Sequence, residues 1–372
     1  MLRNPRAQEN PCIAFVRAVS MRGEGRPVRA PIVVTAQTIG TPYRDACETF
    51  QRLRGRFGKG NVFLLESLTP LSEDSRVSLI GFNPLLTLRI HGEEVHFDGV
   101  SALVRRVVTG ARRDGVMTTV GDRHIITASG LWNLLRSVES GFLLTGALGG
   151  EAFTFGFFGY LGYDVAWSIE KLPTSITTGA GVPDVVLTLY QGVVEFDLAT
   201  AKGRLTVNSA PGMWPELSPA DIASAIAGDE IPRARLGDEL TVPPPLAVSD
   251  TIERGDYLDL VRRALHYISI GDIYQVQLGH RIDIDSMADP VCVYRRLRTR
   301  NPSPYMYFAP FGETVFLGAS PELYVRVADG RITMRPLAGT VRRGATRSAG
   351  STAFARYLTA SAPSPSRTAW IR

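Results

Sequence analysis

The sequence predicts an α+β fold in which antiparallel strands outnumber helices. Three observations carry this prediction. Many short apolar segments lie between turn residues, few stretches have the apolar spacing of a helix face, and strands and helices do not alternate as they do around a parallel sheet. The chain has 372 residues, of which 44% are hydrophobic, so it is long enough to bury the cores of two folded regions.

The first folded region is expected to span residues 31–232. Residues 1–30, which precede it, are rich in Arg, Pro and Gly without a clear period, and this predicts a poorly ordered extension. Residues 233–249 contain three consecutive prolines and are predicted to be a linker. Within the region, apolar periods predict a helix at 42–57, a strand at 61–66, a hairpin of 79–91 with 95–97, a helix at 129–138, a strand at 153–158, a strand pair of 185–197 with 203–208, and a helix at 218–227.

The second folded region is expected to span residues 250–344. Residues 251–270 have the apolar spacing of one helix face, and Gly271 stands where that helix would end in a left-handed conformation. From Ile273 to Ile284 the apolar period changes to two, which predicts a strand. The elements expected next are a helix at 290–298 and two hairpins, 305–309 with 314–319 and 323–327 with 332–336.

The net charge of +5 arises mostly from the end of the chain. Residues 345–372 contain four of the 41 Lys and Arg residues and none of the 36 Asp and Glu residues, so the rest of the chain is nearly neutral. This argues against a nucleic-acid partner. No apolar run is long enough to cross a bilayer, the N-terminus lacks a signal-peptide core, and the three cysteines are widely spaced. We therefore expect a cytoplasmic protein without a membrane partner, a disulfide framework or a zinc site.

Four segments between residues 271 and 340 follow one another in a characteristic order. They read GDIYQVQLGHRIDID, NPSPYMYF, GASPELYVRV and RPLAGT, and together they resemble the chorismate-binding domain of the anthranilate synthase large subunit (component I) and its relatives. Upstream, NVFLLES at 61–67 and FGFFGYLGYD at 155–164 resemble further segments of this family, so the resemblance covers about residues 40–344. It implies an anthranilate-synthase-like sandwich of antiparallel β-sheets with outer helices, incomplete here at the C-terminus.

The resemblance implies an enzyme that converts chorismate and ammonia to anthranilate and pyruvate in tryptophan biosynthesis. In this family Mg²⁺ chelates the substrate carboxylate, and a separate glutamine amidotransferase subunit supplies the ammonia. Gly339 and Thr340 match the family's chorismate-contacting residues. Their chemistry suits that role, because glycine allows a close backbone approach and a threonine hydroxyl can donate to a carboxylate. On their own, the two residues are more typical of a turn after a strand.

Two other functions stay open. The first is aminodeoxychorismate synthase component I of the folate pathway. Many members of that branch carry a nucleophilic lysine at the position of Ala338, and isochorismate-forming relatives carry a lysine base on the strand that holds Gln275 and Gln277. The absence of both lysines favours the anthranilate branch. The second is a non-catalytic fragment that at most binds tryptophan or a partner protein.

Five residues match the family positions that hold tryptophan as an allosteric inhibitor. They are Glu66, Ser67, Pro304, Tyr305 and Met306. A serine hydroxyl and a strand edge suit the amino-acid head group, and tyrosine and methionine pack well against an indole. Two structural alternatives stand beside this role. A glutamate here can simply end a strand at the surface, and an apolar YMYF strand is also typical of a protein core.

The family resemblance stops near Gly344. The remaining stretch, Ala345–Arg372, is dominated by Ala, Ser, Thr and Arg and lacks both helical and strand periodicity. We interpret it as an out-of-frame, disordered tail on a truncated enzyme, with a natural disordered tail as the alternative. The family's magnesium-binding glutamates and catalytic residues have no counterpart in this sequence. We therefore expect no metal ligands, no assignable catalytic residue and no anthranilate formation by this chain.

Overall fold

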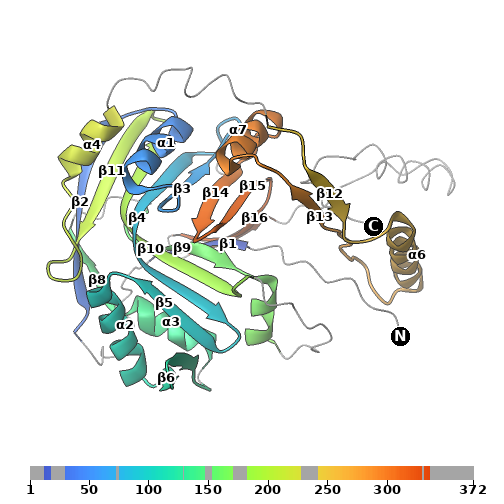
Figure 1. The fold of residues 1–372 in the computed structure, drawn as a ribbon, viewed down its shortest axis with the longest axis horizontal. Helices are drawn as coiled ribbons and strands as arrows, with labels where there is room; N and C mark the ends of the chain where they lie inside the picture. Colours follow the sequence, from blue (N-terminus) through green and yellow to red (C-terminus); the bar gives the residue numbers. More distant parts are fainter. Residues whose placement is uncertain are drawn as a thin grey trace. The chain divides into compact units, whose positions relative to one another are not determined.

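The computed structural model describes residues 12–17, 30–72, 75–128, 130–146, 153–170, 182–227, 242–328 and 331–335. These residues form mainly antiparallel sheets together with helices, which confirms the predicted α+β fold. The chain divides into two units (Figure 1). The larger unit comprises Glu9–Leu240 and Pro290–Ala319, and the smaller unit comprises Met1–Gln8, Thr241–Asp289 and Ser320–Arg372.

Thirteen of the described strands form one curled sheet. They are β1 (Cys12–Arg17), β2 (Ile32–Pro42), β3 (Val62–Glu66), β4 (Val77–His91), β5 (Glu94–Gly99), β6 (Met117–Val120), β7 (Arg123–Ile126), β8 (Phe142–Thr145), β9 (Gly156–Leu161), β10 (Val185–Asp197), β11 (Lys202–Ser209), β14 (Tyr305–Phe311) and β15 (Thr314–Ser320). The main path is β15-β14-β3-β4-β10-β11-β2-β8. From it, β9 and β1 branch at β10, and β5, β7 and β6 branch at β4. β2 and β8 are parallel, whereas the long central pairs are antiparallel.

The two longest strands divide this sheet into two lobes. β4 pairs through its first half with β3 and through its second half with β5, while β10 pairs at one end with β9 and at the other with β11. Between the lobes, Leu85 has no partner in the β4–β10 register, and Asn83 has a φ of 59°. Asparagine tolerates this left-handed conformation, and the Asn83 amide donates to Gln191 Oε1 at 2.6 Å. The resulting bulge bends both strands.

Aromatic side chains fill the space between the two lobes. Phe63 of β3 stacks on Phe158 of β9 with ring centroids 3.8 Å apart, although β4 and β10 separate these strands in the sheet. Phe311 of β14 also stacks on Phe158. We call this cluster the aromatic interior, and its buried members are Phe63, Leu79, Phe158, Tyr160, Val186, Tyr190, Val193, Ala309 and Phe311. The lobes thus face each other as the layers of a sandwich do, but they belong to one continuous sheet.

Five of the described helices of the larger unit cover the outer faces of the lobes (Figure 1). They are α1 (Ala46–Phe57), α2 (Ser101–Arg113), α3 (Leu131–Glu139), α4 (Pro219–Ala227) and α7 (Pro290–Arg300), and the short 3-10 helix η1 (Tyr163–Ser168) follows β9. α1, α4 and α7 pack with β3, β11 and β14 around the buried Phe50 and Phe308, while α2 and α3 pack with β4 and β5. In the core that contains Phe50 and Phe308, position 192 must be a glycine, because a Cβ there would lie 1.9 Å from the Phe82 ring.

The described residues of the smaller unit form two strand pairs and one helix. These are β12 (Ala247–Asp250) with β13 (Ile282–Asp285), β16 (Leu323–Ala328) with β17 (Arg331–Arg335), and α6 (Arg254–Ile270). Gly271 ends α6 with a left-handed φ of 85°, which confirms the predicted helix stop. The linker boundaries and the limits of the predicted regions stay predictions. β1 lies within residues 1–30, where we expect a poorly ordered extension.

The predicted strand at Ile273–Ile284 is wrong over most of its length. Only Ile282–Asp285 is a strand, and its register with β12 ends where Asp250 lies opposite Ile282. A period of two is not sufficient, because a strand also needs a neighbour that satisfies its backbone groups. The strand expected at 153–158 instead starts at Gly156 and continues to Leu161. The sequence reasoning also missed α2 and β2.

Candidate functional site

The pairing of β3 with β14 brings together the residues expected to hold an inhibitor. Met306 lies opposite Glu66 in the antiparallel register, and the backbone N–H of Leu68 donates to the Ser303 carbonyl at 3.1 Å. The C-terminal end of β3 therefore lies beside the N-terminal end of β14. We call this place the β3–β14 junction, and it comprises Glu66, Ser67, Pro304, Tyr305 and Met306.

The Glu66 carboxylate in this junction is buried and fully engaged. Its side chain is 1% exposed. Arg298 of α7 holds both oxygens, with Nε 3.0 Å from Oε2 and Nη2 2.9 Å from Oε1. The Tyr294 hydroxyl also donates to Oε2, at 2.8 Å. Glu66 thus ends β3 inside the core rather than at the surface. An incoming amino group would reach these oxygens only after Arg298 or Tyr294 had moved.

Asp45 extends the network to α1. One of its carboxylate oxygens caps the helix by accepting the backbone N–H of Glu48 at 3.0 Å. The other accepts from Arg298 Nη2 at 2.5 Å, so the guanidinium lies between two carboxylates. The neighbouring Cys47 is buried, and burial, together with the charge of Glu66, raises the pKa of its thiol to about 12. Cys47 therefore stays protonated at neutral pH and is not a nucleophile.

The charges of Glu66 and Arg298 depend on each other. Burial raises the pKa of Glu66, and the positive charge of Arg298 opposes that rise. Burial by itself would lower the pKa of Arg298, but the negative charges of Glu66 and Asp45 raise it overall. The network therefore joins α1, β3 and α7 through one permanent cation. This arrangement suits an anchor more than a group that exchanges protons.

The other junction residues differ in what they offer to a ligand. Ser67 Oγ donates to the Val77 carbonyl at 3.3 Å, so its hydroxyl already serves the fold. Met306 is 1% exposed and packs in the core beneath α1 and α7. Pro304 and Tyr305 are partly exposed. Of the five residues, these two are the ones that a ligand could contact without any rearrangement.

The predicted chorismate contacts Gly339 and Thr340, together with Ala338, lie outside the described residues. Within the described ranges, no group of three or more His, Cys, Asp or Glu side chains is placed to hold a metal ion. The Mg²⁺ binding that the resemblance implies stays a prediction. In the same ranges, no helix is long and apolar enough to cross a membrane.

Sequence reasoning missed three members of the network around Glu66. They are Asp45, Tyr294 and Arg298. Tyr294 and Arg298 are four residues apart, and this spacing placed both on one face of the predicted helix. That is the only local signal available. Nothing local connects Arg298 with Glu66, because 232 positions separate them in the chain.

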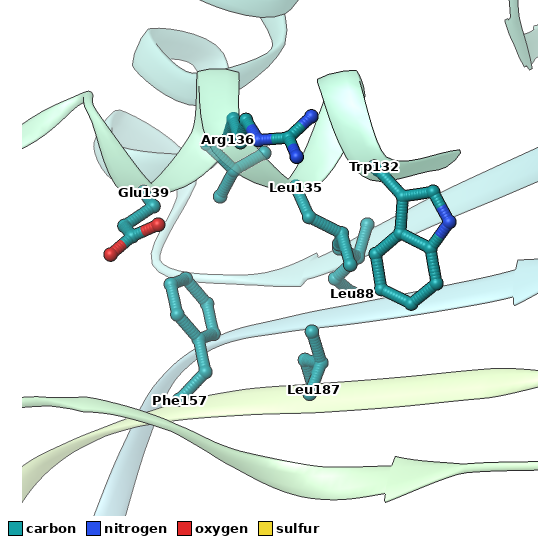
Figure 2. Close-up of a pocket in the computed structure, with 8 residues that line it drawn as sticks. Leu88, Trp132, Leu135, Arg136, Glu139, Phe157 and Leu187 are labelled. Atoms are coloured by element: carbon teal, nitrogen blue, oxygen red, sulfur yellow. The ribbon is translucent and has the colours of Figure 1, made fainter. Parts of the chain in front are cut away.

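A separate pocket lies between α3 and the strands β4, β9 and β10 (Figure 2). Its volume is about 180 Å³. It is lined mainly by apolar side chains, with two charged residues from α3, and its lining comprises Leu88, Trp132, Leu135, Arg136, Val138, Glu139, Phe157 and Leu187. None of these residues belongs to the β3–β14 junction.

Comparison with curated proteins finds several relatives. The chain is 40% identical over 318 residues to a 2-amino-4-deoxychorismate synthase of Streptomyces globisporus, a match that covers 85% of the chain and 63% of that protein. It is 34% identical to anthranilate synthase component 1 of Pseudomonas putida, over 78% of the chain and 56% of the relative. The chain thus spans less than two thirds of the length of these relatives.

A solved structure and a family model also match. The structure is anthranilate synthase component I from Streptococcus pneumoniae TIGR4, with a TM-score of 0.44 and 21% identity, covering 72% of this chain and 55% of that one. The family model is described as chorismate binding enzyme and matches residues 60–361, which is most of the chain. The chain therefore belongs to the chorismate-binding enzyme family.

Proposed function

We propose that the chain belongs to an enzyme that aminates chorismate and releases 2-amino-4-deoxychorismate. The observation that carries this proposal is the 40% identity to the Streptomyces globisporus synthase, against 34% to the Pseudomonas putida anthranilate synthase. The comparisons thus rank an aminodeoxychorismate synthase above anthranilate synthase.

The proposed product keeps the enolpyruvyl group that anthranilate lacks. Its name places an amino group on ring carbon 2 and removes the oxygen on carbon 4, so one chorismate and one ammonia give one product and one water. Anthranilate also carries its amine beside the carboxylate-bearing carbon, but it forms only after the enolpyruvyl group leaves as pyruvate. Ala338 is compatible with both reactions, because ammonia is the nucleophile and no lysine adduct is needed.

Anthranilate synthase component 1 is the second candidate function. Its support is the repeated occurrence of that name among the relatives, including the Thermus thermophilus protein at 32% identity over 86% of the chain. Under either function, the ammonia would come from a glutamine amidotransferase subunit and Gly339 and Thr340 would contact chorismate. Tryptophan inhibition through the β3–β14 junction belongs to this second proposal.

An exchange of segments tests which product forms. Residues 60–335 of this chain would replace the matching segment of the Streptomyces globisporus synthase, and the chimera would be assayed with chorismate, ammonium and magnesium. A product that retains the enolpyruvyl group, identified by mass spectrometry, supports the proposal. Fluorescent anthranilate and free pyruvate favour the second candidate. A chimera that folds but leaves chorismate unchanged, while its parent converts it, counts against both.

The chain by itself is expected to form neither product. The reason is that the family's magnesium-binding glutamates have no counterpart in its sequence. The same assay applied to the 372-residue chain checks this expectation. Turnover that requires magnesium and disappears in Thr340→Ala would contradict it, and would identify Thr340 as a substrate contact.

A further inference from the structure

The pocket beneath α3 has two apolar walls (Figure 2). Leu88, Phe157 and Leu187 come from three neighbouring strands and form the side of the pocket made by the sheet. Trp132 and Leu135 come from α3 and form the opposite side. None of these residues has a role in the proposed function.

The size of the pocket fits one substituted ring. Its volume is about 180 Å³. An engineered apolar cavity of about 150 Å³ stays dry and binds benzene, so this pocket has room for a six-membered ring and a short substituent. A fused polycyclic compound would exceed this space. The lining therefore selects a monocyclic, largely apolar ligand.

Glu139 supplies the polar group at the edge of the pocket. In Figure 2 its carboxylate lies at the Phe157 end. The side chain is partly buried, and among the described residues no hydrogen bond or ion pair of 4 Å or less reaches its oxygens. Burial raises the pKa of Glu139, and the charge of Arg136 opposes that rise. A partly buried carboxylate without a donor is stabilised by any ligand that brings one.

Arg136 competes weakly for this carboxylate. Its Nη1 donates to Asn133 Oδ1 at 3.1 Å, and its guanidinium points away from the strand residues in Figure 2. Arg136 is also exposed, so water screens its charge. The edge of the pocket that adjoins the apolar walls therefore accepts hydrogen bonds and carries a negative charge.

We propose that this pocket binds a small amine that carries a single aromatic ring. The ring lies between the Trp132 side and the strand side chains, and the amine or ammonium donates to the Glu139 carboxylate. A ring without a donor gains only the apolar contacts. A ring that carries a carboxylate meets the like charge of Glu139. The site is independent of the β3–β14 junction and of the proposed amination.

Calorimetric titration of the 372-residue chain with three probes tests this proposal. Benzylamine carries a ring and an ammonium, toluene carries the ring alone, and benzoate carries the opposite charge. At neutral pH we expect benzylamine to bind about tenfold or more tightly than toluene, because a charge-assisted hydrogen bond is added, and benzoate to bind most weakly.

Three variants separate the contributions. Glu139→Gln is expected to bring the affinity for benzylamine down to that for toluene. Leu187→Phe fills the pocket and is expected to abolish binding of all probes, with circular dichroism to check the fold and Leu135→Phe as a second filling variant. Glu216→Gln, an exposed site outside the pocket, should change nothing. Equal affinities for benzylamine and toluene in the unmodified chain would overturn the proposal, as would the absence of saturable binding or a preference for benzoate.

Discussion

The aromatic interior and the charged network around Glu66 hold the same sheet together by different means. In the interior, Phe63 and Phe158 meet across the two lobes through apolar contact alone. In the network, Glu66 is held by Arg298 and Tyr294 through directed hydrogen bonds. An apolar contact tolerates other apolar groups of similar volume, whereas a buried carboxylate requires its particular partners.

This difference shows what each region contributes. Apolar burial supplies stability without specifying which side chains must meet. The charged network supplies little net stability, because desolvation offsets much of the attraction, but it places α7 and α1 at one defined position on β3. We therefore expect the interior to govern how stable the larger unit is, and the network to govern which arrangement of helices it adopts. Four predictions test this division.

The largest expected effect comes from the interior. Phe63→Ala removes a fully buried ring that stacks on Phe158, and a Phe-to-Ala change in a core costs about 3–5 kcal/mol of unfolding free energy. Urea unfolding followed by circular dichroism measures this loss. Tyr163→Ala serves as the control, because Tyr163 is 66% exposed and its truncation should cost less than about 0.5 kcal/mol. Equal losses in the two variants would contradict the assignment of the interior.

Arg298→Met is expected to have the second largest effect, at about 3 kcal/mol. Methionine keeps much of the apolar contact, but Glu66 then stays buried with only the Tyr294 hydroxyl to stabilise it. The matched control is Arg300→Met, at an exposed position on the same helix, which should cost at most about 1 kcal/mol. If both variants unfold at the same urea concentration, Arg298 has no special role in holding α7.

The two regions also differ in how far the sequence predicts them. The nearly continuous apolar run in 185–197 and the glycine after Ile270 predict β10 and the end of α6, because both signals are local. The interior follows only once strand order is known, since Phe63 and Phe158 come from strands that are not neighbours. The resemblance placed Glu66 and Met306 in one site, and the register of β3 and β14 puts them opposite each other.

The partners of Glu66 lay beyond any local signal. Asp45 falls inside the helix predicted at 42–57, although in the structure it caps α1, and Arg298 is one of several arginines on a predicted helix. Their meeting depends on how α1 and α7 pack on β3, which is a property of the assembled sheet. The strand wrongly predicted at Ile273–Ile284 has the same origin, because its period is local but its pairing is not.

Tyr294→Phe tests how much a single hydroxyl contributes to the network. The ring stays in the core beneath α7, so apolar burial is unchanged, and only the hydroxyl that donates to Glu66 Oε2 is lost. Arg298 still holds both oxygens, and we expect a loss of about 1.5 kcal/mol, about half of that for Arg298→Met. Combining the two changes should cost more than their sum, because Glu66 then has no donor from α7. A strictly additive double variant would show that the two donors act independently.

The smallest expected effect is a dependence of stability on pH. Burial, as the larger influence, holds the pKa of Glu66 above its ordinary value of 4.5 in the folded chain. A raised pKa means that the folded state favours the protonated carboxyl, so this contribution to stability is fully present below pH 4.5 and is lost as the pH rises through the folded-state value. The stability of the unmodified chain minus that of Glu66→Gln should therefore fall as the pH increases across this window, as measured by urea midpoints.

In the Arg298→Met background the fall should move to higher pH, because the opposing cation is gone. A difference that rises with pH would mean that the pairing with Arg298 outweighs burial, and the network would then stabilise the fold in its own right, as the aromatic interior does.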